Sequence, residues 1–329
     1  MKKILIYNMR DYDEKFWCDK YSKELGVELV CCPTDPGLDN VHLAEGCDTM
    51  SIITTKIPAD LAKAFYDQGI RFISTRTMGY DHIDVNACKR LGIRIGNVNY
   101  GTEGVAEYAV MLMLMTIRNI KYIMGKAAMH DFSLKGNCGR ELKDFTVGVM
   151  GTGRIGKNVI KLLKSFGCKI LAYDLYESEE VKKDATYVTL DELYAQSDLI
   201  TLHMPLFENN FHIINKEAIA KMKDKVVIIN TARGGLIQTE ALIEGIESGK
   251  IAGAGLDVVE EEFGLYYNDL KYGPLHHPGL AILNSFPNVV VTPHMAFYTD
   301  NDVAIMVGSS LKSCKAFMNG EENPWEVKL

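Results

Sequence analysis

The segment Gly151–Gly156, Gly-Thr-Gly-Arg-Ile-Gly, has the glycine spacing of loops that bind the pyrophosphate of a dinucleotide. A β-rich apolar run predicts a strand before it, and Lys157–Phe166 predicts an amphipathic helix after it. In that context Gly151 permits a tight turn, Gly153 lets phosphates approach the backbone, and Gly156 lets the helix pack closely on the strand. We therefore expect a dinucleotide-binding site here.

An acidic residue, Asp174, follows the next expected strand, Lys169–Tyr173, at roughly the 20-residue spacing typical of NAD-binding folds. Its carboxylate can accept hydrogen bonds from the adenosine ribose hydroxyls, and its charge would repel the 2′-phosphate of NADP. Leu175 and Tyr176 come next, so no arginine is placed there to hold such a phosphate. The sequence favours NAD as the cofactor.

Three ionisable residues, Arg233, Glu262 and His294, lie just past expected strands of the same half, where open α/β sheets bind their ligands. An arginine can hold an anion, and a histidine beside a carboxylate can transfer a proton. Considered singly, each has an ordinary structural explanation: a surface arginine at a turn, one of three solvated glutamates, or a histidine that caps a helix. Their shared position after strands makes them candidates for a catalytic cluster.

Short β-rich runs alternate with amphipathic helical stretches along both halves of the chain, which is the pattern of βαβ units in a parallel sheet. A long helix is expected over 102–119, and a last helix over 300–318 could pack back on the first domain. We therefore predict an α/β protein with two doubly wound parallel-sheet domains. The expected strands are 4–7, 27–31, 50–53, 72–74, 93–95, 146–150, 169–173, 198–202, 226–229, 252–256 and 289–292.

Two segments interrupt this rhythm. Gly264–Pro287, rich in Tyr, Gly, His and Pro, is too long for an ordinary connection and suggests a functional loop. Met111–Met115 is apolar on every side of its helix, so it should be buried by the core or by a second subunit. We expect a homodimer built through the cofactor domain; burial within a monomer is the alternative.

The 329 residues, 47% of them hydrophobic, suffice for about two globular domains. A net charge of −7 without a basic cluster argues against nucleic acid and anionic membranes as partners, and no apolar run is long enough for a signal peptide or membrane span. The eight cysteines contain no Cys-x-x-Cys pair, so we expect buried thiols, a cytoplasmic location and no metal site.

Several segments resemble the D-isomer-specific 2-hydroxyacid dehydrogenases, in family order and over essentially the whole chain. The resemblance is greatest to the NAD-dependent D-lactate dehydrogenase branch, which includes the vancomycin-resistance type. The matching segments are Ile73-Ser74-Thr75-Arg76 with Gly79 and His82-Ile83-Asp84, Gly96-Asn97-Val98 with Tyr100, the glycine loop, Leu202-His203-Met204-Pro205, Asn230-Thr231-Ala232-Arg233-Gly234, Ala254-Gly255-Leu256-Asp257 and Thr292-Pro293-His294.

This resemblance implies reversible reduction of a 2-oxo acid, pyruvate in the first place, to the (R)-2-hydroxy acid by NADH. Residues 1–100 with 298–329 would form a flavodoxin-like substrate domain, and 101–297 a Rossmann NAD domain. Arg233 would bind the substrate carboxylate and polarise the 2-oxo group, while His294 would protonate the carbonyl oxygen. Glu262 would favour the imidazolium and orient its ring, although only family spacing selects it over Glu260 and Glu261.

The remaining contacts are also implied by the resemblance. The backbone amides of Met78 and Gly79 would give the substrate carboxylate a second contact, in a cleft that closes on it. The substrate side-chain pocket would consist of Ile52, Tyr100, Phe297 and Tyr298. The cofactor contacts would be Gly151, Gly153, Arg154, Ile155, Gly156, Asp174, Met204, Pro205, Asn210, Thr231, Ala232 and Asp257.

Two alternatives remain open. Phenyllactate-type relatives share a run like Phe297-Tyr298-Thr299-Asp300, so an aromatic or branched 2-oxo acid is a second substrate class. C-terminal-binding-protein corepressors share the fold, the glycine loop and an Arg-Glu-His set, and act as NAD-sensing interaction proteins. Rapid NADH oxidation with pyruvate or phenylpyruvate would indicate the enzyme, whereas tight NADH binding without turnover would indicate the sensor.

The acidic side chain at position 174 predicts a cofactor preference that kinetics can measure. The kcat/KM for NADH should exceed that for NADPH, and a ratio at or below one would contradict the prediction. Asp174→Ala should weaken NADH use and relieve the repulsion of NADPH.

Overall fold

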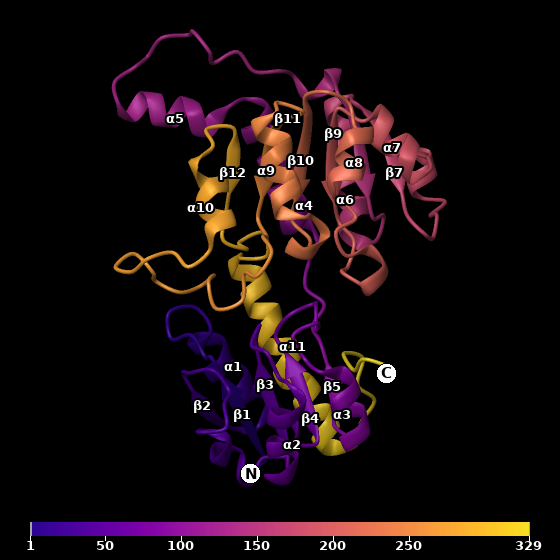
Figure 1. The fold of residues 1–329 in the computed structure, drawn as a ribbon. Coiled ribbons are helices and arrows are strands. Elements are labelled where there is room, and N and C mark those ends of the chain that lie inside the picture. Colours follow the sequence, from indigo (N-terminus) through magenta and orange to yellow (C-terminus); the bar gives the residue numbers. More distant parts are fainter. Residues whose placement is uncertain (1, 329) are drawn as a thin grey trace. The chain divides into compact units, whose positions relative to one another are not determined.

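The structure is a computed structural model that describes residues 2–328. The chain divides into two compact units: residues up to Gly101 join with those from Tyr298 onward, and Thr102–Phe297 form the second unit. Each unit is built around its own sheet, and every strand pair in both sheets is parallel (Figure 1). The predicted α/β class with two doubly wound parallel sheets is confirmed.

The first unit has a five-stranded sheet in the order β2-β1-β3-β4-β5. Helices α2 and α3 pack against each other over one hydrophobic core, and α1 and α11 over another. The elements are β1 Lys3–Tyr7, α1 Lys15–Leu25, β2 Glu28–Cys32, β3 Thr49–Ile52, α2 Ala59–Asp67, β4 Phe72–Thr75, α3 Val85–Leu91, β5 Arg94–Gly96 and α11 Asp300–Asn319.

The C-terminal helix α11 completes the first unit, as its sequence suggested. It packs along β3 and β4, although both strands lie more than 200 residues before it in the sequence. The buried hydroxyl of Ser310 makes hydrogen bonds of 2.8 Å to Ser51 Oγ on β3 and 2.9 Å to Ser74 Oγ on β4. These polar contacts fix the register of the helix on the sheet.

The second unit has a seven-stranded sheet in the order β12-β11-β10-β9-β6-β7-β8. Helices α4 and α6 cover one face, and α7, α8, α9 and α10 cover the other. The elements are α4 Glu103–Ile117, α5 Ile120–Ala128, β6 Thr146–Met150, α6 Arg154–Phe166, β7 Lys169–Tyr173, β8 Thr186–Tyr187, α7 Leu190–Gln196, β9 Leu199–Leu202, α8 Lys216–Lys221, β10 Val226–Asn230, α9 Thr239–Glu247, β11 Ile251–Leu256, α10 Pro278–Ser285 and β12 Val289–Val291.

Three local predictions need correction. The helix expected at Lys157 begins at Arg154, directly after Gly153. The end of the expected Gly264–Pro287 loop is helix α10, because Pro278 suits a first helical position and the His277 side chain accepts a hydrogen bond from the Leu280 amide. The short elements α5 and β8 were not expected.

Burial of the thiols and of the methionine-rich run is uneven. All eight cysteines are free, but Cys31 and Cys138 are exposed and Cys168 is partly exposed, unlike the other five. In α4, Leu112 and Met113 are buried whereas Met111 is 38% exposed. One side of the α4 run therefore faces solvent in the single chain. None of the helices within residues 2–328 has the length and apolar character needed to cross a membrane.

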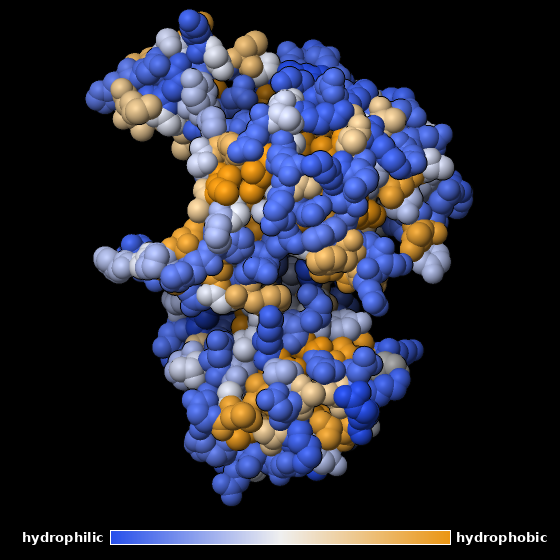
Figure 2. Space-filling view, viewed as in Figure 1, coloured by the Kyte–Doolittle hydropathy of each residue, from blue (hydrophilic) through white to orange (hydrophobic). Residues whose placement is uncertain are grey.

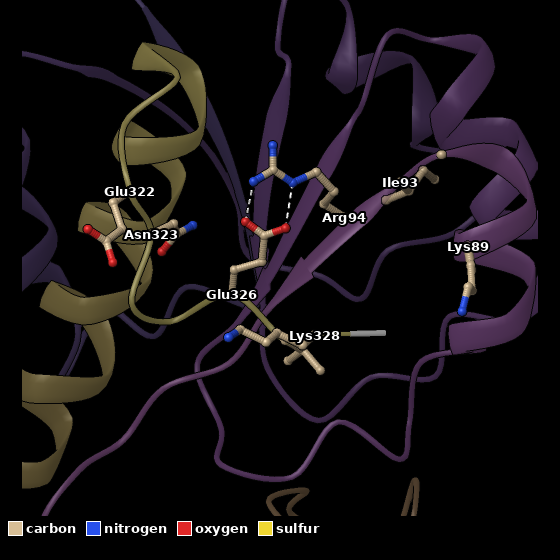
Figure 3. Close-up of a pocket in the computed structure, with 9 residues that line it drawn as sticks. Lys89, Ile93, Arg94, Glu322, Asn323, Glu326 and Lys328 are labelled. Carbon is tan, nitrogen blue, oxygen red and sulfur yellow. Dashed lines mark hydrogen bonds and ion pairs between the residues drawn. The ribbon is translucent and has the colours of Figure 1, made fainter.

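A hollow in the first unit lies beside β5, α3 and the C-terminal segment (Figure 3). Lys89, Arg94, Glu322, Glu326 and Lys328 are among its lining residues, so both charge signs meet there. The Arg94 guanidinium forms a two-pronged ion pair with Glu326 across the hollow (Figure 3). Because the guanidinium of Arg94 is already paired with this carboxylate, Arg94 is not available to bind an anion in the hollow.

The glycine loop follows β6, at the point where the strand order reverses between β6 and β9. Gly151 has φ 91°, and a Cβ there would lie 2.7 Å from the carbonyl carbon and oxygen of His203. A Cβ on Gly156 would lie 2.0 Å from the Gly151 oxygen, whereas one on Gly153 would meet no protein atom within 4 Å. Packing against other protein atoms therefore requires glycine at positions 151 and 156, whereas the space beside Gly153 is open.

These distances predict opposite outcomes for two alanine variants. Gly156→Ala forces α6 away from the Gly151 backbone at the end of β6 and should destabilise the fold by roughly 1–3 kcal/mol. Gly153→Ala should leave the melting temperature unchanged and weaken NADH binding, because its methyl group enters the space expected for the pyrophosphate. Thermal unfolding and NADH fluorescence titration measure the two effects; equal melting temperatures for both variants would contradict the packing argument.

Candidate active site

The carboxyl ends of three neighbouring strands carry the candidate catalytic residues. Arg233 follows β10, Glu262 lies beyond β11, and His294 follows β12, and these strands are adjacent in the order β12-β11-β10. Parallel neighbours end at the same edge of a sheet, so residues far apart in the sequence are brought to one place. The local contacts determine how each side chain is held there.

His294 and Glu262 form a short ion-pair contact, with 2.6 Å between Nδ1 of the imidazole and Oε1 of the carboxylate. Their side chains are 23% and 15% exposed, respectively. Oε2 of Glu262 also accepts a hydrogen bond of 3.2 Å from the Val259 amide, which fixes the carboxylate. With Nδ1 directed at Glu262, the hydrogen-bond network assigns Nε2 as the nitrogen that can exchange a proton with a ligand.

The fully buried Asp257 holds the segment that carries His294. Oδ1 accepts hydrogen bonds from Thr292 Oγ1 at 2.6 Å and the Met295 amide at 2.8 Å, and Oδ2 accepts one from the Ala296 amide at 2.9 Å. Burial raises the pKa of Asp257, although the three hydrogen bonds and nearby His294 oppose the rise. Asp257 lies inside the loop as a structural support for His294.

His294 itself has an unusual backbone conformation, with φ 54°. Left-handed backbone is uncommon for residues other than glycine and persists where the surroundings impose it. The His294 amide donates hydrogen bonds to the carbonyl oxygens of Asp257, at 2.7 Å, and Thr292, at 3.0 Å. Hydrogen bonds from two directions thus stabilise the turn that presents the imidazole.

Two aromatic rings flank the imidazole within the second unit. The ring centroids of Tyr267 and Phe297 lie 6.3 Å and 6.2 Å from that of His294, and 6.3 Å from each other. The hydroxyl of Tyr267 donates a hydrogen bond of 2.9 Å to the His294 carbonyl oxygen. Phe297 was predicted as a pocket residue; Tyr267 was missed, and the only signal for it was the tyrosine-rich character of its loop.

Arg233 belongs to a tightly constrained turn after β10. The side chain of buried Asn230 accepts a hydrogen bond from the Ala232 amide and donates one to the Arg233 oxygen, each of 2.9 Å. A Cβ on Gly234 would lie 1.9 Å from the Val259 oxygen, so only glycine fits. The arginine turn therefore lies directly against the segment that leads to Glu262.

Asp174 has contacts that were not anticipated. Its Oδ2 accepts hydrogen bonds from the Thr152 amide at 2.6 Å and from Thr152 Oγ1 at 3.1 Å. Oδ1 accepts one from the Tyr176 amide at 3.0 Å. The aspartate therefore anchors the glycine loop to the end of β7, and an Asp174→Ala variant loses this anchor as well as the acidic charge.

The residues directly after β9, His203 and Met204, pack against Gly151 of the glycine loop. Burial lowers the pKa of His203 to about 3, so its ring is neutral, and Nε2 contacts Thr201 Oγ1 at 2.8 Å. Met204 and Pro205 follow it. The Asn210 side chain donates a hydrogen bond of 2.8 Å to the Pro205 oxygen and accepts one of 2.7 Å from the Phe207 backbone amide. These bonds fold the side chain onto its own loop.

Two observations agree with a bound dinucleotide. Gly153 offers open space beside the first turn of α6, where Arg154 and Ile155 lie. The Oγ1 atom of Thr231, at the end of β10, is buried and has no hydrogen-bond partner in the described residues 2–328. A buried hydroxyl without a partner is costly, and a polar group of a ligand would satisfy it. Both residues belong to the predicted cofactor set.

The predicted substrate residues of the first unit occupy loops at strand ends, with one exception. Met78 and Gly79 follow β4, and their carbonyl oxygens accept hydrogen bonds from Asn97 Nδ2 and Thr77 Oγ1. Tyr100 comes after β5. Ile52 is fully buried and belongs to the hydrophobic core of the first unit.

Tyr298, at the beginning of the C-terminal segment, is bound to the first unit. Its hydroxyl donates a hydrogen bond of 2.8 Å to Asp13 Oδ2, and the Arg10 guanidinium lies 5.8 Å from the ring centroid. Partial burial and the Asp13 carboxylate raise the pKa of Tyr298 to about 12, so the phenol stays protonated. It remains a hydrogen-bond donor at neutral pH.

Comparison with known proteins agrees with this arrangement. A family model described as D-isomer specific 2-hydroxyacid dehydrogenase, NAD binding domain, matches residues 110–296. An aromatic 2-oxoacid reductase of Clostridium sporogenes is 43% identical over 96% of both chains. A D-lactate dehydrogenase of Lactiplantibacillus plantarum is 40% identical over 99% of both chains.

The likeness extends to three dimensions. The solved structure of a D-2-hydroxyisocaproate dehydrogenase has a TM-score of 0.88, with 38% identity and 99% of each chain covered. Sequence, fold and the ends of β10, β11 and β12 lead to one conclusion. The chain belongs to the D-isomer-specific 2-hydroxyacid dehydrogenases, NAD-dependent oxidoreductases that act on the CH–OH group of 2-hydroxy acids.

Proposed function

We propose that this enzyme reduces pyruvate to (R)-lactate, and runs the reverse oxidation, with NADH and NAD as the cofactor pair. The observation that carries the proposal is the 2.6 Å contact between His294 and Glu262 at the strand edge that also carries Arg233. An arginine for a carboxylate and a histidine for a carbonyl oxygen match the two functional groups of a 2-oxo acid. The similarity to a D-lactate dehydrogenase supports pyruvate as the substrate.

The chemistry divides among the three side chains. NADH, when bound, supplies the hydride that C2 of the substrate accepts. Arg233 binds the substrate carboxylate through its planar pair of donors and polarises the 2-oxo group. His294 gives its Nε2 proton to the carbonyl oxygen, so pyruvate, NADH and one proton become lactate and NAD⁺. Glu262 stabilises the imidazolium and keeps its ring in place.

The remaining predicted residues would bind the two ligands. The backbone amides of Met78 and Gly79 give the substrate carboxylate a further contact, and Tyr100 and Tyr298 contribute to its side-chain pocket. The cofactor set stays as predicted from the sequence. Asn210 already uses its side-chain amide within its own loop, and Asp257 uses its carboxylate to hold the segment after β12, so we propose that both act mainly by shaping the cofactor surface.

A second candidate activity is the reduction of aromatic 2-oxo acids. The aromatic rings of Tyr267 and Phe297 flank the proton donor and would offer an apolar, edge-to-face surface to a phenyl group. The similarity to an aromatic 2-oxoacid reductase agrees with this reading. Phenylpyruvate is therefore the competing substrate to measure against pyruvate.

We also propose that the enzyme is a cytoplasmic homodimer formed through its second unit. The face of α4 and α6 carries an apolar groove that includes Met111, Leu114 and Phe166. Helix α5 and the following segment form an arm (Figure 1), and its apolar side chains lie among polar ones in Figure 2. On this arm Phe132 is 77% and Leu134 is 89% exposed. A second copy of the chain would cover this surface.

The proposed cytoplasmic location agrees with the free thiols, which suit a reducing compartment.

Loss of the proton donor or its partner should change the pH dependence of catalysis. Reduction needs the imidazolium and oxidation the neutral ring, so the two directions should respond to pH in opposite senses. Glu262→Gln keeps the shape but removes the charge, so the reductive kcat/KM profile should move towards lower pH. His294→Gln should lose about 10²–10⁴ in rate because the acid itself is gone.

The same assays decide between the substrates. Pyruvate and phenylpyruvate are compared by kcat/KM in wild type and in Phe297→Ala, which should lose phenylpyruvate turnover preferentially if that ring contacts the substrate. No turnover of any 2-oxo acid, or a His294→Gln enzyme at wild-type rate, would overturn the proposed mechanism. Superimposable pH profiles for wild type and Glu262→Gln would remove Glu262 as the partner of His294.

Charge on the arm should abolish dimerisation. Leu134→Asp places a carboxylate in the apolar contact, so light scattering should show a monomer where the wild type shows a dimer. Leu38→Asp, at an exposed leucine of the first unit, is the matched control and should remain dimeric. A wild-type enzyme that is monomeric at assay concentration would contradict the proposal.

A further inference from the structure

Glu260, two residues before Glu262, forms a second histidine–glutamate pair with His212. Nε2 of His212 is 2.5 Å from Oε1 of Glu260, and the side chains are 27% and 19% exposed. Oε2 of Glu260 accepts hydrogen bonds from the amide, at 2.7 Å, and the hydroxyl of Thr239, the first residue of α9. A carboxylate at a helix N-terminus is favourable because it satisfies a free amide and opposes the helix dipole.

Further contacts join the segments around this pair. The Glu260 carbonyl oxygen accepts a hydrogen bond of 2.8 Å from His277 Nε2, at the start of α10. The His212 amide donates one of 2.9 Å to the Gly235 oxygen, two residues after Arg233. Glu260 thereby connects the segment after β9, the arginine turn with α9, and α10. Two of these stretches meet at the Glu260 carboxylate, and α10 is joined through the Glu260 backbone oxygen.

The packing of Gly234 links this network to the substrate-binding arginine. A Cβ on Gly234 would lie 2.5 Å from the Glu260 nitrogen and 1.9 Å from the Val259 oxygen. The arginine turn is therefore in backbone contact with the glutamate segment, residues 259–262. Displacement of one would displace the other. Glu261, between the two paired glutamates, and His212 both have φ 54°, a strained conformation that surrounding contacts must hold.

We propose that His212 and Glu260 form a positioning pair that holds Arg233 and Glu262 in register for catalysis. We assign the pair no contact with the substrate, so its role is to position other residues. We expect it to act by hydrogen bonding, because the Glu260 carboxylate joins His212 to the amide and hydroxyl of Thr239 and no proton transfer is assigned to the pair. The inference rests on the proposed function, because its effect is measured on 2-oxo acid reduction.

Three consecutive glutamates offer a test with internal controls. Glu260→Ala should raise the KM for the 2-oxo acid and lower kcat, each on the order of tenfold, because small misplacements of catalytic groups are costly. Glu261→Ala should match wild type, since that side chain is exposed. Glu262→Ala should mainly lower kcat. Melting temperatures and NADH titration give the fraction of folded, cofactor-binding enzyme to which each rate is normalised.

Conservative variants separate hydrogen bonding from charge. In Glu260→Gln the amide oxygen can still accept from Thr239, and its NH₂ can donate to neutral His212, so most activity should return. Glu262→Gln should not rescue Glu262→Ala in this way, because His294 needs the charge. His212→Ala should reproduce the Glu260→Ala change in KM, and His212→Gln should restore part of it.

The outcomes decide the inference separately from the proposed function. Wild-type constants per folded Glu260→Ala enzyme would overturn the positioning role, even if the variant melts at a lower temperature. A Glu260→Gln enzyme with no more activity than Glu260→Ala would also overturn the positioning role. If wild type itself reduces no 2-oxo acid, the proposed function fails first, whatever the variants do.

Discussion

The hydrogen bonds of the buried Asp257 carboxylate are the interaction on which the candidate active site of the second unit depends. This carboxylate lies directly after β11 and accepts three hydrogen bonds from the segment after β12. A carboxylate without these partners would be too costly to bury, and the segment without the carboxylate would have no reason to keep the left-handed turn at His294. The hydrogen bonds that this buried acid requires thus orient His294, the proposed proton donor.

The same logic extends along the sheet edge. Asn230 closes the arginine turn, Gly234 packs on the backbone of the glutamate segment, and Glu260 connects that segment to α9 and α10. Because strands β10, β11 and β12 are mostly buried and pair with one another, a few polar contacts suffice to hold these turns. Each of the three turns carries one of the proposed catalytic residues, which is positioned by neighbours for which no chemical step is proposed.

Much of the architecture was predictable because the signals are local. A parallel sheet covered on both faces needs continuous apolar strands, and β10 is buried at every residue. Glycine spacing and the acid after β7 predicted the cofactor loop, since backbone approach and ribose recognition need those residue types. Local signals failed at α10, where Pro278 and Gly279 begin a helix that the composition of the loop concealed.

The sequence by itself determined the class of fold, the dinucleotide loop and the candidates Arg233, Glu262 and His294. Tertiary structure alone decided which of three adjacent glutamates contacts which histidine: Glu262 lies against His294, Glu260 against His212, and Glu261 faces solvent. Spacing along the chain carries no such information, because the partners lie 32 and 48 residues away. The direction of each side chain depends on backbone turns that form only when neighbouring strands and loops pack together.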